Sequence, residues 1–257
     1  MGTGFVISII VIIIAGGFLY RSMQRRGGNN KLPKDTRRLL TENVAFYNKL
    51  DDKGKALFEA RVNDFIAHVS IRGVDVIIED LDHVLVAAGA IIPIFAFPDW
   101  RYNNISEVLL YKDTFNKDFS ADGGERNVLG MVGDGAMHRE MILSKPALRA
   151  SFRNPADGHN TAIHEFAHLI DKADSETDGV PEYLLANPSI APWVKIMHET
   201  INDMKKKNHS DIDLYGATND AEFFAVVSEY FFEKPGELKE HHPELYGMLE
   251  QMFHTKG

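Results

Sequence analysis

The sequence contains no cysteine. Disulfide bonds and thiolate metal sites are therefore excluded, so any bound zinc must be held by histidine and carboxylate ligands. Basic residues are fewer than acidic ones, 28 against 37, which gives a formal net charge of -9. A surface that binds nucleic acid needs an excess of Lys and Arg, so we expect no nucleic-acid partner. With 257 residues, 44% of them hydrophobic and 25% charged, the chain has the composition of a globular protein of one or two domains.

Charge is also absent from the N-terminus, because residues 1–20 carry no charged side chain. The apolar stretch at 4–20 has 17 residues, at the short end of the range for a membrane-spanning helix. Basic residues follow this stretch and none precedes it: Arg21, Arg25, Arg26, Lys31, Lys34, Arg37 and Arg38. Because positive charge collects on the cytoplasmic side, the asymmetry predicts a single-pass anchor in the inner membrane with the large domain in the cytoplasm. A cleaved signal peptide is the alternative, which Ala15-Gly16-Gly17 keeps open, but it would need basic residues before the apolar stretch.

The predicted organisation has three parts. A transmembrane anchor at 1–20 is followed by a basic flexible linker at 21–36, which contains a Gly-Gly-Asn-Asn run at 27–30. The remaining residues, 37–257, are long enough to form a domain with its own hydrophobic core.

Two segments of this domain have the pattern of helices. Apolar residues recur at helical spacing over 57–69, and Gly73 is expected to end that helix. The apolar run at 84–97 is too short for a second membrane span and is interrupted by Pro93. It therefore predicts a buried helix of the core.

Strands are few. Short apolar runs predict strands at 108–111 and 141–144, with a loop or hairpin at 120–135 between them. From residue 160 onward the pattern is largely helical, with a loop at about 174–192 that contains three prolines. Helices with few strands in irregular order indicate the α+β class with a small sheet.

The segment that carries chemistry is 160–168, Asn-Thr-Ala-Ile-His-Glu-Phe-Ala-His. It contains the pattern H-E-x-x-H at His164, Glu165 and His168. Residues four apart share one face of a helix, so both imidazoles can bind the same ion. Glu165 lies beside the open position, where it can take a proton from an attacking water. Asn160 is a plausible N-cap for this helix.

The pattern alone is also compatible with a surface helix that carries two unrelated histidines. Apolar residues around the pattern argue against that alternative: Ala162, Ile163, Phe166, Ala167, Leu169 and Ile170. Such a helix is mostly buried, and buried ionisable groups need partners.

A catalytic zinc needs a third protein ligand, and the apolar segment 219–232 offers two candidates. Glu222 and Glu229 lie seven residues apart, two helical turns on one face. A metal removes the cost of burying a carboxylate, so either can be the ligand, and the other can accept a hydrogen bond from a ligand histidine. Pairing with Lys or Arg elsewhere is the alternative for both. Tyr215 could donate a hydrogen bond to an oxyanion, although spacing alone supports this weakly.

These residues resemble a known family. The segment 157–171 and the spacing of Tyr215, Glu222 and Glu229 are similar to those of the Mlc titration factor A family of zinc-dependent peptidases. The similarity covers roughly residue 50 to the C-terminus, and the two-helix arrangement also resembles the catalytic domain of anthrax lethal factor. The family takes its name from binding a glucose-responsive transcriptional repressor, so a regulatory protein partner is possible here.

The resemblance implies roles that spacing left open. It implies that Glu222 is the third zinc ligand, that Glu229 supports a ligand histidine, and that Tyr215 donates a hydrogen bond in the transition state. It implies a zincin-like domain whose edge strand, expected at 141–144, pairs with an extended substrate. Asp171 becomes a second candidate for supporting the metal ligands, with ordinary solvation at a helix end as its alternative.

The functional prediction is a membrane-tethered zinc metallopeptidase acting on peptides or proteins, with Glu165 as general base and residues 37–257 as the zinc peptidase domain. Aminopeptidase-like activity is an expectation from the family. The alternative is a membrane-anchored protein that sequesters a transcriptional regulator and holds zinc for structure only. A scaffold without zinc would leave the buried carboxylates unexplained.

Overall fold

The computed structural model describes residues 32–113, 130–132, 139–185 and 187–253. Residues from Leu32 onward form one compact unit. The predicted anchor at 1–20 and residues 21–31 of the predicted linker at 21–36 lie outside the described residues. Among the helices that are described, none is long and apolar enough to cross a membrane.

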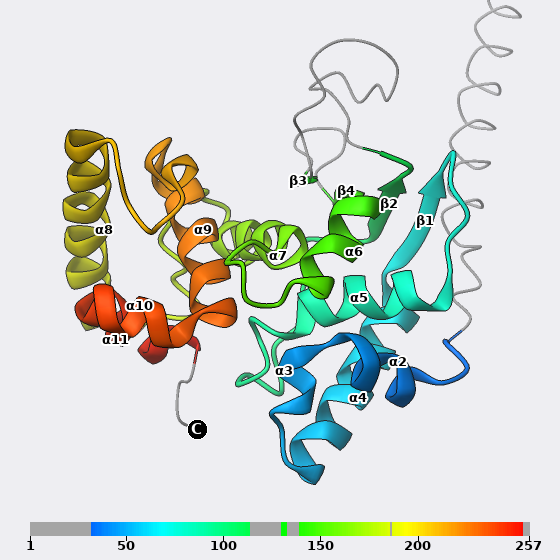
Figure 1. Cartoon of the computed structure of the whole chain (residues 1–257). Coiled ribbons are helices and arrows are strands. Elements are labelled where there is room, and N and C mark those ends of the chain that lie inside the picture. The colour runs from blue at the N-terminus through cyan, green and yellow to red at the C-terminus, as the bar shows by residue number, and fades with distance from the viewer. Residues whose placement is uncertain (1–31, 114–129, 133–138, 186, 254–257) are drawn as a thin grey trace, which may run out of the picture. The chain divides into compact units, whose positions relative to one another are not determined.

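Helices account for most of the described residues. Those of the first half are α2 (Thr36–Asn43), α3 (Ala45–Asn48), α4 (Asp52–His68), α5 (Asp80–Ile91) and α6 (Lys145–Arg153). Those of the second half are α7 (Thr161–Asp171), α8 (Asn187–Lys207), α9 (Asp220–Glu233), α10 (Pro235–His241) and α11 (Pro243–Phe253), with the short 3-10 helices η2 (Lys172–Asp174) and η3 (Leu214–Ala217). The small sheet lies at one side of the helices, opposite α8, α10 and α11 (Figure 1).

The sheet has four strands in the order β1-β2-β4-β3. They are β1 (Ser70–Val74), β2 (Glu107–Tyr111), β3 (Gly130–Val132) and β4 (Glu140–Ser144). The first three in this order are parallel, and β3 runs antiparallel to β4. A small mixed sheet with many helices confirms the α+β class.

The predicted strands at 108–111 and 141–144 are both present, but the expectation that 141–144 forms the edge of the sheet is wrong. It belongs to β4, which is paired on one side with β2 and on the other with β3. Among the described strands the edges are β1 and β3, and β3 consists of three residues within the segment predicted to be a loop or hairpin. So short a strand has no periodicity of its own that a sequence pattern could reveal.

The helix predicted over 57–69 is present within α4, but Gly73 does not end it. His68 is the last residue of α4, and Gly73 lies inside β1. The buried helix predicted at 84–97 is α5, which begins earlier and ends at Ile91, because Pro93 has no backbone N–H with which to continue the hydrogen bonds of the helix.

The loop predicted at 174–192 ends too late, since α8 begins at Asn187 and includes two of the three prolines. Pro188 is tolerated because the first turn of a helix has unpaired N–H groups in any case. Pro192 removes one hydrogen bond of the helix. Burial of the adjacent Trp193, which is 0% exposed and donates from its indole to the Gly179 carbonyl at 2.6 Å, offsets that loss.

Helix α7 occupies the centre of the fold, between α9 on one side and α5 and α6 on the other (Figure 1). Its packing against α5 is close. A Cβ atom on Gly89 of α5 would lie 2.4 Å from the Cβ of Ala162 of α7, so the helices approach this closely only with glycine there. Helix α7 also packs against α9 through buried side chains. These contacts hold in place the two helices that carry the candidate site.

Candidate metal centre and active site

The start of α7 presents the two histidines of the H-E-x-x-H pattern on one face. Asn160 is the N-cap, and its Oδ1 accepts a hydrogen bond from the Ile163 N–H at 3.1 Å. Four residues apart, His164 and His168 bring their Nε2 atoms within 3.2 Å of each other. Their side chains are 13% and 14% exposed, so both imidazoles are largely buried and do not lie on an open surface.

Glu222 of α9 completes a cluster with these histidines. Its Oε2 lies 3.0 Å from His164 Nε2 and 3.4 Å from His168 Nε2. One donor atom from each residue lies within 4.8 Å of the others. Asn219 caps α9 and accepts from the Glu222 N–H at 2.9 Å, which fixes the helix at the residue that faces the histidines. Two imidazoles and one carboxylate are a donor set that fits a divalent transition metal, so these residues can hold a metal ion.

Interactions within the cluster favour a positively charged His164 and a negatively charged Glu222. Burial lowers the pKa of His164, but hydrogen bonds with Glu222 and Glu229 outweigh this and hold the pKa well above its ordinary value. Burial raises the pKa of Glu222, yet hydrogen bonds with His164 and His168 hold that pKa well below the ordinary carboxyl value. The carboxylate is therefore ionised and ready to neutralise positive charge between the two imidazoles.

Glu229 lies on the other side of His164, outside the three-residue cluster. It is 5% exposed, and its Oε1 accepts from His164 Nδ1 at 2.7 Å. Its Oε2 accepts from the backbone N–H of Asn160. The two glutamates that spacing could not distinguish therefore differ in position: Glu222 faces the Nε2 atoms, and Glu229 holds the opposite ring nitrogen.

Glu165 is buried beside this cluster, with 5% of its surface exposed. Burial raises the pKa of Glu165 above its ordinary value, and the neighbouring His164 and His168 oppose the shift. The backbone of β3 lies directly against it, because a Cβ on Gly130 would be 2.6 Å from Glu165 Cγ and Oε1. Gly130 lies in the segment predicted to be a loop or hairpin, and no sequence motif points to its place beside the base.

Tyr215 lies on η3, next to the cluster. Asp213 caps this short helix and accepts from the Tyr215 N–H at 2.8 Å. The ring centroids of Tyr215 and His164 are 6.2 Å apart, and the tyrosine is 54% exposed. Burial of part of the ring and the nearby Glu222 raise the pKa of Tyr215 to about 12, so the phenol keeps its proton at neutral pH.

Asp171 is the last residue of α7 and is 0% exposed, so ordinary solvation at a helix end is wrong for it. Its Oδ2 accepts from the Gly179 N–H at 3.0 Å, and its Oδ1 has no hydrogen-bond partner. Burial raises the pKa of Asp171 to about 6. Its hydrogen bond thus goes to the loop that follows α7, and a role in supporting the metal ligands stays a prediction.

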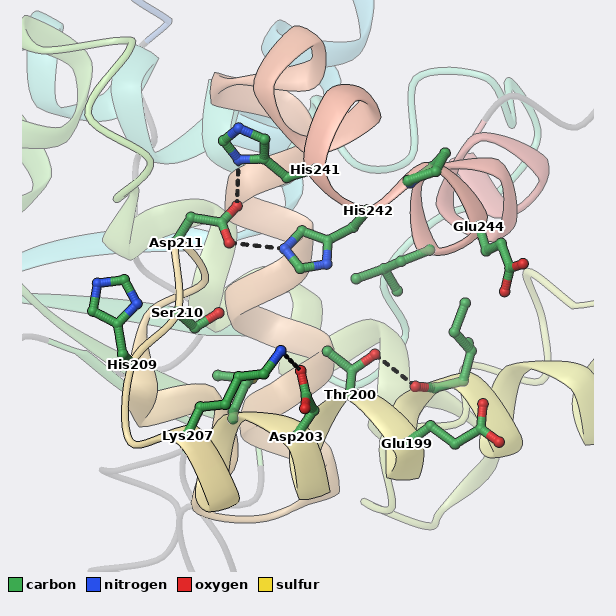
Figure 2. A pocket seen from close by; sticks show the side chains of 14 residues that line it. Glu199, Thr200, Asp203, Lys207, His209, Ser210, Asp211, His241, His242 and Glu244 are labelled. Carbon is green, nitrogen blue, oxygen red and sulfur yellow. Dashed lines mark hydrogen bonds and ion pairs between the residues drawn. The ribbon is translucent and has the colours of Figure 1, made fainter.

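A second cluster of titratable side chains, which no sequence motif predicts, is centred on Asp211 in the loop before η3. Asp211 accepts from Tyr230 Oη at 2.8 Å, from His241 Nδ1 at 3.0 Å and from His242 Nε2 at 2.9 Å. Figure 2 shows both imidazoles pointing at the carboxylate, beside a cavity of about 770 Å³. These residues belong to no motif, and only the packing of α9 and α10 on the loop brings them together. The cluster ties the segment that leads to Tyr215 to the helix that carries Glu222.

Comparison with known proteins gives consistent results. The model of the family described as glucose-regulated metallo-peptidase M90 matches residues 20–254. An uncharacterized protein of Synechocystis sp. is 29% identical over 232 residues, which cover 86% of this chain and 84% of that protein. Mlc titration factor A of Pectobacterium atrosepticum is 29% identical over 173 residues, 63% of this chain and 64% of that protein. Mlc titration factor A of Salmonella arizonae is 29% identical over 196 residues, 72% of this chain and 76% of that protein.

Proposed function

The chain belongs to the family of glucose-regulated metallo-peptidases M90, and we propose that it is a zinc-dependent peptidase with His164, His168 and Glu222 as the metal ligands. Family membership confirms the resemblance on which the prediction was based. The observation that carries the proposal is the convergence of two imidazoles and one carboxylate from α7 and α9, with the buried Glu165 beside them. A site that held zinc for structure alone would have no use for a buried glutamate at that position, and it would usually have four protein ligands.

Zinc bound there would supply a Lewis acid that polarises a peptide carbonyl and makes water a stronger nucleophile at neutral pH. The protein's own groups perform the proton transfers. Glu165 accepts a proton from the attacking water and returns it to the nitrogen of the leaving amine. Tyr215 keeps its phenolic proton and donates a hydrogen bond to the oxygen on which negative charge develops.

Glu229 prepares His164 for its role. A carboxylate that accepts the Nδ1–H fixes the tautomer, so Nε2 carries the lone pair that a metal requires. The same carboxylate also accepts from the backbone N–H of Asn160. This second hydrogen bond holds Glu229 in place, so its bond to Nδ1 limits rotation of the His164 ring.

The proposed substrate is a peptide or a protein segment in extended form. Within the described residues, β3 pairs only with β4, and its Gly130 lies against Glu165. An extended peptide added to the sheet at β3 would pass the general base, which moves the expected substrate strand from 141–144 to β3. Peptides with free and with blocked N-termini would separate aminopeptidase-like from endopeptidase activity.

The decisive test compares wild type with Glu165→Gln, using the full chain purified in detergent. We expect equal zinc content and a loss of turnover of at least about 100-fold, because general-base catalysis contributes about 10²–10⁴. Glu244→Gln, an exposed residue of α11, is the matched control and should behave as wild type. Peptide hydrolysis by Glu165→Gln at the wild-type rate would contradict the proposed mechanism.

Regulator binding is the second candidate function, and the name Mlc titration factor A of several relatives favours it. In that case the chain would sequester a transcriptional regulator, and Glu165→Gln would bind the regulator as well as wild type does. A pull-down with both forms, run beside the peptidase assay, separates the two functions. Regulator capture with no peptide hydrolysis by wild type would favour the second.

The inner-membrane anchor is also part of the proposal. Its support is the uncharged stretch at 1–20 and the basic residues after it. We expect the chain to stay in the membrane fraction after alkaline carbonate washing and to be released by detergent. Protease added outside the membrane should leave the domain at 37–257 intact. A mature N-terminus after residue 17 would instead establish the cleaved signal peptide.

A further inference from the structure

Asn160 connects the beginning of α7 to the end of α9 through every polar group it has. Its Oδ1 caps Ile163, and its carbonyl accepts from the His164 N–H at 2.9 Å. Its backbone N–H donates to Glu229 Oε2, and its Nδ2 donates to Glu233 Oε1 at 3.1 Å. At 2% exposure the residue has no competing water, so these bonds fix both its backbone and its amide plane.

Glu233 is the unexplained partner in this arrangement. It is the last residue of α9, one turn beyond Glu229, and it is half-buried. Oε1 accepts from Asn160, Oε2 is buried without a well-formed hydrogen bond, and the backbone N–H of Gly158 lies close enough to the carboxylate to favour its ionised form. Keeping an incompletely satisfied carboxylate there costs free energy, and the neighbouring Asp157 and Glu229 add like charge. The hydrogen bond to Asn160 is therefore the contact of Glu233 that calls for an explanation.

We propose that Glu233 is a positioning residue for the metal centre, which acts through Asn160 and Glu229 on His164. Glu233 Oε1 orients the Asn160 amide, so that Oδ1 faces the Ile163 N–H and caps the helix. The capped backbone directs the Asn160 N–H at Glu229, whose other oxygen holds His164 Nδ1. The inference rests on the proposed metal site but concerns residues that touch neither metal nor substrate.

The acceptor on Glu233 is the essential element of this chain of contacts. Without it, the amide of Asn160 can rotate and present Nδ2 to the Ile163 N–H, which removes the cap. The first turn of α7 then loosens where it meets Glu229, and the imidazole loses a fixed orientation. A residue that only joined two helices would affect the free energy of unfolding and leave the metal geometry unchanged once the protein is folded.

The experiment uses Co²⁺ as the probe on the full chain in detergent. The dissociation constant is measured by competition with a chelator, and the visible absorption spectrum reports the ligand geometry. We expect Glu233→Leu to weaken Co²⁺ binding by about tenfold or more and to change the spectrum, as loss of groups that orient metal ligands does. Glu233→Gln keeps the acceptor for Asn160 and should bind within about twofold of wild type.

Two further variants make the result decisive. Asn160→Ala removes both the capping oxygen and the amide that Glu233 orients, so it should show the same weakening as Glu233→Leu and tests the proposal even if Glu233→Leu fails to fold. Asp51→Ala removes the cap of α4, which accepts from the Gly54 N–H at 2.7 Å, and serves as a stability control with wild-type Co²⁺ binding.

Wild-type affinity and spectrum in Glu233→Leu or in Asn160→Ala would overturn the proposal. So would equal weakening by Glu233→Gln and Glu233→Leu, because the charge and not the acceptor would then matter. Absence of Co²⁺ binding by wild type would refute the metal site itself, and the inference with it. Hydrolysis that survives Glu165→Gln would refute only the peptidase mechanism and would leave the metal measurements to decide the role of Glu233.

Discussion

His164 Nδ1 lies 2.7 Å from Glu229 Oε1, although the two residues are 65 positions apart in the sequence. The contact exists because α7 and α9 pack side by side, and it gives the two ring nitrogens of His164 different partners. Nδ1 meets Glu229, and Nε2 meets Glu222 and His168. The relationship separates the two glutamates of α9 by function: one is placed to bind a metal ion, and the other to hold the ligand.

This separation predicts different results for the two glutamates in a measurement of metal content. Glu222→Ala should lose zinc from the purified chain, because two histidines alone leave the ion one protein ligand short. Glu229→Gln should retain nearly stoichiometric zinc but bind it about tenfold more weakly in chelator competition. Within the described residues, the ion pairs of Glu222 and Glu229 are with histidines and not with Lys or Arg. Neither substitution therefore breaks an ion pair with a Lys or Arg side chain.

Atomic emission measurements on both variants and wild type provide the check. The reverse pattern, with loss of zinc in Glu229→Gln and retention in Glu222→Ala, would exchange the two assignments. Loss in neither would remove both residues from the site.

The residues of the metal cluster could be predicted because local rules determine them. The spacing of His164 and His168 follows from helix geometry, and Glu222 was marked by being ionisable in an apolar segment. The same reasoning left Glu222 and Glu229 equivalent, since a period of seven places both on one face. Only the contact between the two helices, which depends on packing far apart in the sequence, distinguishes them.

Other parts of the site could not be predicted for the same reason. Gly130 acts through the absence of a side chain, and Glu233 through an asparagine 73 residues away. Asp211 and its histidines are brought together by α10, which has no motif. The strand β3 is too short to show a periodic pattern in the sequence. Its position becomes evident only from its pairing with β4 and from its contact with Glu165.

Tyr215→Phe tests the oxyanion donor. Removing one hydroxyl from a half-exposed ring should leave zinc content and folding unchanged. We expect kcat to fall by about 10²–10³, the usual effect of losing an oxyanion donor, with little change in KM. Because the pKa of Tyr215 is raised to about 12, the wild type should show no loss of activity from its ionisation below about pH 10.

Tyr183→Phe is the control, since Tyr183 is 60% exposed and lies outside the cluster. Steady-state kinetics of both variants decide the matter. An unchanged kcat in Tyr215→Phe would remove the residue from the mechanism, and a rise in KM alone would assign it to substrate binding.

Asp211→Asn should change the dependence of stability on pH. Burial raises the pKa of Asp211, but hydrogen bonds from His242, Tyr230 and His241 hold it well below its ordinary value, and the bond to Asp211 raises the pKa of His241. The depressed carboxyl pKa stabilises the fold above about pH 4 and loses its effect as pH falls through the folded-state value. The raised histidine pKa stabilises it below about pH 6.5 and loses its effect as pH rises through the folded-state value.

Both contributions are therefore present together at about pH 4–6.5, and denaturant unfolding of Asp211→Asn should differ most from wild type in that window. The difference should shrink as pH rises through the raised pKa of His241, where that imidazole loses its charge. Asp203→Asn is the control. It lines the same cavity and pairs with Lys207 at the surface, where an ion pair contributes little (Figure 2). A difference that is constant from pH 5 to 9 would show that ionisation of the cluster does not affect stability.

Gly130→Ala tests the contact between β3 and the general base. The added Cβ would lie 2.6 Å from Glu165 Cγ and Oε1, closer than van der Waals contact allows, so either the strand or the carboxylate must shift. A displacement of about 1 Å at a reacting group can cost about 10²-fold in rate, so we expect kcat to fall by about 10–100-fold while zinc content stays the same. Gly236→Ala on α10 is the control, because nothing lies within 4 Å of its added Cβ, and alanine is the better helix former. Equal kcat in Gly130→Ala and wild type would mean that β3 shifts without moving Glu165. The strand would then lie beside the general base but would not determine its position.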